Sequence, residues 1–364
     1  MSTLATNAIT DASGGNTATI NSYTPIESNM AGRNKIINGD MRIDQRNNGA
    51  SVSHTGATIF TLDRFKLLGT SSAGVFSIQQ DASAPAGFSA SMKITVTTTD
   101  TSLTGDDRYN VQQQIEGYNI SDFAFGTASA KDVTASFWVR SSVTGTFGGA
   151  LQNGASDRSY PFTYEISSAD TWEYKTVTIP GETTGTWATD SGRGMTLYVA
   201  LGCGPNRSGT ANAWASANYH TATGATNLMA TSGATFYLTG VQLEAGSVAT
   251  PFERRSYGQE LALCQRYFFA QEFNATQTWG CGHRQTSNVG RWTTTVPVPM
   301  RATPSFSSTA TLRAVFSGGD VALTSPSVLS SYGLFVVIEG TAVGVEPSAN
   351  AYGYGGVNNY SAEL

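Results

Sequence analysis

A repeat of apolar residues at every second position over 133–140 constrains the fold more than any other feature of this sequence. Every second side chain is apolar, namely Val133, Ala135, Phe137 and Val139. A period of two is the repeat of a β-strand that buries one face. The same period recurs at residues 94–96, 111–115 and 195–201, with polar, turn-rich segments between them. Many short, half-buried strands of this kind predict two packed β-sheets.

One candidate strand breaks the alternation. In residues 172–179, Tyr174 is out of phase with Val177 and Ile179. A strand that buries one face can place Tyr174 and Val177 on it together only if an extra residue lies between them. We therefore expect a β-bulge in this strand.

The segment 238–269 divides the chain in two. It begins with a strand pattern at Val241 and Leu243, which Gly246 and Pro251 end. Ser256 can then cap a helix, with Gln259 at the third position of a capping box. This predicts a β-sandwich over residues 34–254 and a smaller β-rich domain over 255–364, with one short helix near 256–268.

Apolar residues of the predicted helix follow a 4-3-4 spacing, at Tyr257, Leu261, Cys264 and Phe268. The stripe has two interpretations. It packs on the sheets of its own chain, or it lines a three-fold axis with two sister helices. Cys203, Cys264 and Cys281 are an odd number, so a disulfide framework is not expected, and we expect Cys264 to be a buried free thiol.

Several short motifs, taken in order, resemble a broad group of bacteriophage virion proteins usually described as tail fibres. These motifs are NKIINGDMRIDQR (34–46), TLDRF (61–65), GVQLEAGSVATPFERRSYGQELALCQRYF (240–268), VPMRATP (298–304) and SAEL (361–364). The resemblance covers most of the chain from residue 34 onward. It implies that the sandwich is a jelly roll like those of carbohydrate-binding modules, and that the protein is a homotrimer.

Residues 1–33 are rich in Ser, Thr, Asn and Gly and carry few large apolar side chains, so they cannot bury enough surface to fold alone. They are either a disordered tail or an arm that orders against a partner. Because attachment to the particle is commonly N-terminal in the resembling proteins, we expect an arm that binds other virion proteins.

The long loop at residues 202–233 supplies candidate glycan contacts. It carries Trp214, Tyr219 and His220, and long loops without structure of their own are commonly functional or mobile. Together with Trp187, these side chains are our candidate glycan-binding residues. They either stack on sugar faces or pack down onto the sandwich.

No catalytic or metal-binding set stands out. His54, His220 and His283 are far apart, and the pair at Cys281 and His283 has no second pair to complete a zinc site. There is no nucleophile elbow and no phosphate loop. We therefore expect no enzyme and no required cofactor. A structural calcium ion at Asp106 and Asp107, within residues 104–110, is an alternative to a simple solvated turn.

The net charge of −5 and the absence of a Lys/Arg block argue against nucleic acid or an anionic membrane as a partner. No apolar run approaches the ~20 residues that a membrane helix needs, and residues 1–20 lack a secretory signal pattern. The sequence predicts a protein made in the host cytoplasm and built into the virion as a trimeric tail fibre or fibre tip that binds host-surface glycan. Two alternatives are a capsid or neck decoration protein and a tailspike that depolymerises polysaccharide.

Overall fold

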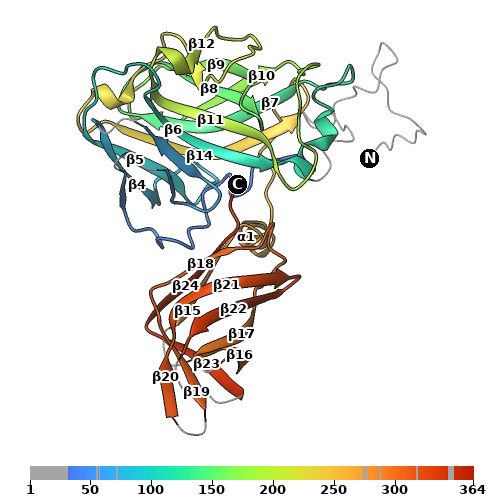
Figure 1. Cartoon of the computed structure of the whole chain (residues 1–364). Coiled ribbons are helices and arrows are strands. Elements are labelled where there is room, and N and C mark those ends of the chain that lie inside the picture. Colours follow the sequence, from blue (N-terminus) through green and yellow to red (C-terminus); the bar gives the residue numbers. More distant parts are fainter. Residues whose placement is uncertain are drawn as a thin grey trace, which may run out of the picture.

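The computed structural model describes residues 32–54, 56, 58–70, 73–273, 277–286, 288–316, 319–342 and 348–364. Within these residues the protein is mainly β, with a two-sheet sandwich, a smaller β-rich domain and one α-helix between them (Figure 1). The fold class predicted from the sequence is confirmed. Of the expected attachment arm at residues 1–33, only Gly32 and Arg33 belong to the described residues.

Two six-stranded antiparallel sheets form the sandwich in the described residues. The first sheet contains, in order, β1 (Val52–His54), β4 (Val75–Asp81), β5 (Ser91–Thr98), β14 (Thr235–Ala245), β7 (Val133–Ser141) and β10 (Glu173–Ile179). The second contains β2 (Ile59–Phe60), β3 (Lys66–Gly69), β6 (Arg108–Glu116), β11 (Arg193–Cys203), β8 (Gly145–Asn153) and β9 (Ser159–Ile166). Strand β14 lies between β5 and β7, so neighbours in the sheet come from distant parts of the chain, as in a jelly roll.

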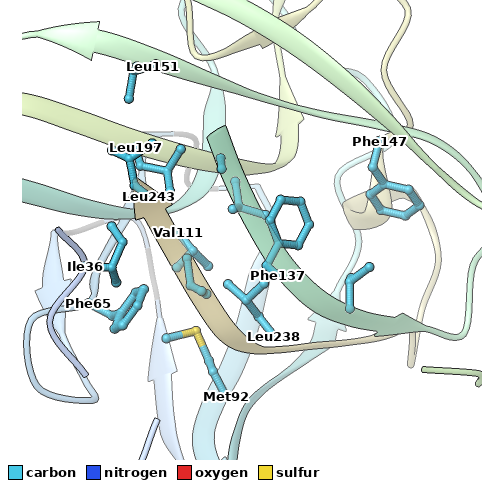
Figure 2. Close-up of a cluster of buried hydrophobic side chains, with 14 of the residues drawn as sticks. Ile36, Phe65, Met92, Val111, Phe137, Phe147, Leu151, Leu197, Leu238 and Leu243 are labelled. Carbon is cyan, nitrogen blue, oxygen red and sulfur yellow. The ribbon is translucent and has the colours of Figure 1, made fainter. Parts of the chain in front are cut away.

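The core between the sheets is built from the alternating apolar residues. Phe137 of β7, Leu197 of β11 and Leu238 of β14 are almost completely buried and face one another (Figure 2). Ile36 and Phe65, which come from two of the resemblance motifs, extend this core beyond the strands. Burial of one face of each strand therefore accounts for the period of two in the sequence.

The bulge expected in residues 172–179 is wrong. Strand β10 pairs with β7 in one unbroken register, with Tyr174 opposite Trp138 and Val177 opposite Ala135. Tyr174 is out of phase because its side chain points away from the core. Strand β14 of the same sheet does have an irregularity, between Thr239 and Gln242 of its pairing with β7.

The predicted helix is shorter than expected. Helix α1 spans Tyr257–Gln265, and the Ser256 hydroxyl accepts a hydrogen bond from the Gln259 amide at 3.3 Å, as the capping box predicts. Phe268 lies outside the helix, as the first residue of β15 (Phe268–Phe273), so the four-residue stripe on one helix is wrong. Cys264 is a buried free thiol, as expected, whereas Tyr257 is 56% exposed. Leu261 packs beside Cys264 against the chain's own residues.

Two sheets share the core of the C-terminal domain. A three-stranded sheet contains β15, β24 (Gly356–Ser361) and β18 (Ser305–Ser308). A seven-stranded sheet contains β20 (Gly319–Ala322), β19 (Thr311–Phe316), β23 (Ser348–Tyr354), β16 (Gln277–Arg284), β17 (Val289–Thr295), β22 (Phe335–Thr341) and β21 (Thr324–Tyr332). Trp292 and Tyr360, one from each sheet, are fully buried in the core between them.

The loop between β11 and β14 contains short structure. Strands β12 (Ser208–Gly209) and β13 (Thr221–Ala222) form a parallel pair, with the 3₁₀ turns η4 (Pro205–Arg207) and η5 (Leu228–Ala230) beside them. Two further turns, η2 (Gly117–Asn119) and η3 (Ser121–Phe123), follow β6. The loop is therefore held against the second sheet.

The resemblance motifs at 34–46, 61–65 and 361–364 meet the helical end of the motif at 240–268 between the two domains, and we call this region the joint. Its apolar part contains Ile37, Ile43, Cys264 and Tyr267. Its polar part includes the buried Glu116, which accepts hydrogen bonds from Arg266 at 2.6 Å and from the Tyr267 hydroxyl at 2.7 Å. The motifs therefore encode a tightly packed contact between the domains.

Candidate ligand-binding groove

The outer face of the first sheet carries an open groove of about 530 Å³, which we call the aromatic groove. It is lined by residues of β7, β10 and β14, of the turn before β5, and of the linker before α1. The residues that define it are Phe88, Trp138, Tyr174, Gly240, Phe252 and Arg254. None of its ten described lining residues is Asp, Glu, His or Cys. The lining of the groove is therefore mostly aromatic and small, with Arg254 as its charged side chain.

Trp138 and Tyr174 form the aromatic surface of the groove. They are directly opposite in the antiparallel pair of β7 and β10, so both side chains leave the same face of the sheet. Their ring centroids are 5.3 Å apart, and Tyr174 is 43% exposed. The half-buried Trp138 ring and the exposed Tyr174 ring can together contact an apolar ligand face while hydroxyl groups of the ligand stay in water.

Gly240, in the irregular part of β14, makes room for the Phe88 and Trp138 rings. Gly240 has a φ of +62°, which disfavours a side chain. A Cβ at this position would lie 2.8 Å from Phe88 Cζ and 3.1 Å from Trp138 Cδ1. Glycine therefore permits the two rings to pack closely against the backbone of β14.

The linker after β14 forms the opposite wall. The Phe252 ring packs edge-on against Phe88 at 5.2 Å between centroids. The Arg254 guanidinium lies over the Phe88 ring at 4.7 Å and near the Phe252 ring at 5.7 Å. These contacts hold an otherwise exposed arginine at the edge of the groove.

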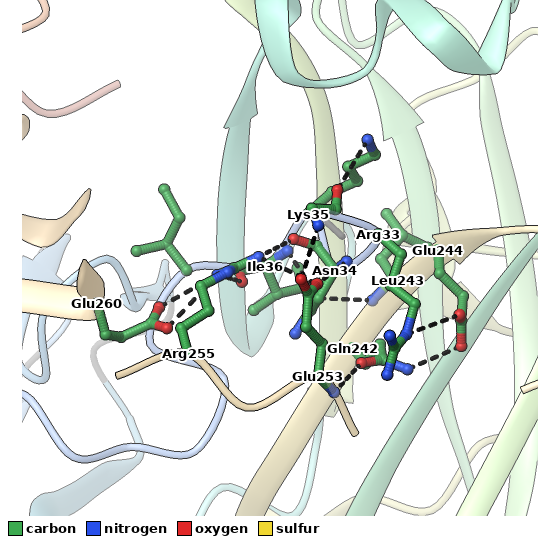
Figure 3. Close-up of polar contacts among 12 residues, drawn as sticks. Arg33, Asn34, Lys35, Ile36, Gln242, Leu243, Glu244, Glu253, Arg255 and Glu260 are labelled. Carbon is green, nitrogen blue, oxygen red and sulfur yellow. Dashed lines mark hydrogen bonds and ion pairs between the residues drawn. The ribbon is translucent and has the colours of Figure 1, made fainter. Parts of the chain in front are cut away.

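Buried polar side chains of β14 hold the linker in place (Figure 3). The Glu244 carboxylate accepts hydrogen bonds from the Thr250 amide at 2.8 Å and from its hydroxyl at 2.6 Å. Gln242 Oε1 accepts from the Glu253 amide at 2.8 Å, and Glu253 in turn accepts from the Asn34 amide at 2.7 Å. Gln242 and Glu244 are buried, so this network fixes the linker and preorganises the groove wall.

A second depression, of about 400 Å³, adjoins the aromatic groove, and we call it the polar pocket. Phe88 and Arg254 line both. In the polar pocket, the Asp40 carboxylate forms an ion pair with Arg42. Asp40 is only 4% exposed, and its Oδ1 has no hydrogen-bond partner in the described residues. The aromatic groove thus offers stacking surfaces and adjoins a pocket lined by charged side chains.

Two of the predicted glycan-binding residues, Trp187 and Trp214, lie elsewhere. They contact each other and the Phe125 ring, with centroid distances of 5.8 Å between the tryptophans and 4.8 Å from Trp187 to Phe125. Their indole nitrogens donate to the carbonyls of Thr184 at 3.1 Å and Pro180 at 2.8 Å. Both side chains pack down onto the sandwich, which was the alternative to a sugar contact.

His220 packs on the outer face of the second sheet. Its ring stacks on Tyr198 at 4.1 Å and contacts Asn110 Nδ2 at 3.0 Å and Asn218 Oδ1 at 2.9 Å. Burial, reinforced by nearby arginines, lowers the pKa of His220 to about 3. Tyr219 lies against Gly209, where a Cβ would meet its ring. None of the four predicted residues lines the aromatic groove, and glycan contact through them stays a prediction.

The groove residues Trp138 and Tyr174 were not singled out from the sequence. Two signals for them were present: the outward phase of Trp138 in an alternating strand, and the broken phase of Tyr174. Read together, they indicate two aromatic side chains on a solvent face. The broken phase of Tyr174 is compatible with either a bulge or an outward-facing ring, and the register between β10 and β7 distinguishes the two.

The described residues contain no group of three or more His, Cys, Asp or Glu side chains that could hold a metal ion. At the expected calcium position, Asp107 Oδ2 accepts from the Thr104 amide at 2.9 Å and Asp106 pairs with Arg207 at 3.1 Å. Both carboxylates are thus engaged within the protein. Across the part of the chain that the structure describes, no helix has the length and apolar character needed to cross a membrane.

No protein family and no curated protein matches the sequence. Among solved structures, a putative sugar binding protein from Bacteroides thetaiotaomicron matches 59% of this chain and 100% of its own, at 12% identity and a TM-score of 0.35. The enzymatically active domain of bacteriophage CBA120 tailspike protein 4 matches 58% of this chain and 21% of its own, at 11% identity and a TM-score of 0.31. TmCBM61 in complex with beta-1,4-galactotriose matches 59% and 99%, at 8% identity and a TM-score of 0.29. All three scores are below 0.5, so the case for function rests on the groove itself.

Proposed function

We propose that this chain is a non-enzymatic structural protein of a bacteriophage virion, a trimeric tail fibre or fibre tip, that binds host-surface glycan in the aromatic groove. The observation that carries the proposal is the outward pair of Trp138 and Tyr174. Sugar rings present apolar C–H faces and a rim of hydroxyl groups. An aromatic pair of this kind, with polar groups beside it, complements both.

The virion assignment is supported by the resemblance motifs. They occur in order along the chain and four of them meet at the joint. The described end of the proposed attachment arm is bound to the linker, because the Gly32 amide donates to Glu253 at 2.7 Å and Arg33 donates to the Pro251 carbonyl at 2.5 Å. The arm would therefore bind other virion proteins from a point fixed beside the groove.

A homotrimer is supported by exposed apolar side chains on the hairpin of β21 and β22. Leu329, Tyr332, Leu334 and Phe335 are all exposed, and Tyr332 is 87% exposed. An apolar surface of this kind commonly marks a protein contact. Three copies would also let three shallow grooves act together, because linked weak sites gain affinity from avidity.

The groove is tested with a glycan array probed by the wild-type chain and by two variants, Trp138→Ala and Trp214→Ala. The proposal predicts that Trp138→Ala loses binding while Trp214→Ala keeps it, because only Trp138 lines the groove. Retained binding by Trp138→Ala would rule the groove out as the glycan site.

The location is tested with gold-labelled antibody against the chain on intact particles. Label on the tail is the expected result. Label confined to the capsid or neck would replace the fibre with a decoration protein.

A further inference from the structure

We infer that the aromatic groove selects acidic oligosaccharides, with Arg254 binding a sugar carboxylate. The inference rests on the proposed function and names the class of glycan that the groove takes. The observation behind it is that Arg254, unlike the neighbouring Arg42 and Arg255, has no ion pair within the described residues.

Arg254 lies where the two depressions meet and lines both of them. Its side chain is exposed, and no hydrogen bond or ion pair engages it within the described residues. Its guanidinium makes cation–π contacts with the Phe88 and Phe252 rings. The group is thus positioned by the protein while its hydrogen-bond donors remain free for a ligand.

The neighbouring arginines are already committed. Arg42 is paired with Asp40, and Arg255 contacts Glu260 at 3.3 Å and Glu253 at 3.7 Å. The charge of Arg254 is therefore the unneutralised one among the described residues lining the two depressions. A chain with a net charge of −5 thus presents a positive centre at its groove.

A carboxylate fits this centre better than a neutral hydroxyl. The planar fork of a guanidinium can donate two parallel hydrogen bonds to the two oxygens of a carboxylate. Arg42 already balances the charge of the Asp40 carboxylate, so no unpaired anion in the described lining of the polar pocket competes with a ligand for Arg254. A sugar acid supplies a carboxylate, hydroxyl groups and an apolar ring face in one molecule.

The test uses the full chain and calorimetric titration with uronic-acid hexasaccharides, namely oligogalacturonate, oligomannuronate and hyaluronan, each beside its carboxyl-reduced counterpart. We expect at least one carboxylated probe to bind about tenfold more tightly than its reduced form, because a hydrogen bond to a charged group contributes that much. Arg254→Gln should erase the difference, and Arg254→Lys should restore part of it. Arg284→Gln, at an exposed position on β16, is the matched control and should leave the difference intact.

The outcomes separate the two proposals. Equal binding of carboxylated and reduced probes, lost in Trp138→Ala but unchanged in Arg254→Gln, would overturn the acidic selectivity and leave glycan binding in place. Binding that Trp138→Ala does not affect, or no binding to these probes or to any array glycan, would overturn both.

Discussion

The Glu363 carboxylate accepts a hydrogen bond of 2.9 Å from the guanidinium of Arg46, 317 positions earlier in the sequence. The same carboxylate pairs with Arg64, whose guanidinium lies 3.5 Å from the centre of the Tyr267 ring. One carboxylate thus joins the C-terminal domain to two segments of the sandwich. The joint therefore combines these ion pairs with the buried apolar cluster of Ile37, Ile43, Cys264 and Tyr267.

Removal of the Glu363 charge should loosen the joint. Arg64 is only 2% exposed, and the Glu363→Gln variant leaves its charge without an anionic partner. We expect a loss of about 3 kcal/mol in the free energy of unfolding, the cost typical of breaking a buried pair. Urea titration measures it.

The matched control for this variant is Glu339→Gln. Glu339 pairs with Arg291 at 2.8 Å, but both side chains are one-third exposed, so the loss should stay below about 1 kcal/mol. Equal losses in the two variants would show that the Glu363 pair is not a special contact.

Asp63, also at the joint, should make the stability depend on pH. Burial raises the pKa of Asp63 to about 6, although Arg46 and hydrogen bonds from Gln45 oppose the shift. The folded state therefore resists ionisation of this carboxyl. Its favourable contribution is complete below pH ~4, where the unfolded chain is protonated too, and is lost as the pH rises through 6.

Relative to Asp63→Asn, the wild type should gain roughly 2 to 3 kcal/mol of unfolding free energy as the pH falls from 7 to 4. Urea titrations of both proteins at several pH values measure this difference. Parallel stability curves would mean that Asp63 ionises normally in the folded protein.

His220 should give the opposite dependence. Its pKa is lowered to about 3, mainly by burial and further by Arg108 and Arg207. The neutral ring is favoured in the folded state, so its contribution is complete above pH ~6.5 and is lost as the pH falls toward 3. At pH 5 the loss relative to His220→Gln should be about 2 kcal/mol.

Hydrogen exchange of residues 204–224 is the direct readout, because His220 holds this loop on the second sheet. Acid should accelerate exchange there in the wild type more than in His220→Gln. The exposed His283 on β16 supplies the control, and His283→Gln should behave as the wild type does. The same pH dependence of exchange in the wild type and in His220→Gln would contradict the role of His220.

Tyr174 should contribute directly to glycan affinity. For a glycan identified on the array, Tyr174→Ala should weaken binding by about tenfold or more, as expected of an aromatic side chain central to a contact. Tyr332→Ala removes a still more exposed tyrosine from the C-terminal domain and should change the intrinsic affinity of a single site very little. A similar loss in both variants would indicate an indirect effect.

The sandwich was predictable because burial of one strand face is a local pattern that repeats along the chain. The capping box at Ser256 was predictable for the same reason. The end of α1 was not, because Phe268 continues the helical spacing while it starts β15. Its backbone pairs with β24, a strand almost ninety residues later.

The groove could not be predicted as a site because it forms from segments that only the fold brings together. Nothing in the sequence indicates that Gly240, Phe88 and Arg254 lie close together. Trp214, Tyr219 and His220 were candidate glycan contacts because the loop that carries them is long and polar in composition. Whether such residues face solvent depends on tertiary contacts. In the structure, Trp214 and His220 contact the sandwich and hold the loop against it.

The most direct test of the account is tryptophan fluorescence during titration with a glycan that the array identifies. The protein has six tryptophans, and the bound sugar is expected to lie on Trp138. Trp138→Phe keeps an aromatic ring, so it should still bind the glycan but lose most of the emission change, while Trp214→Phe should keep that change. An emission change that persists in Trp138→Phe and disappears in Trp214→Phe would contradict the account and place the sugar on the loop.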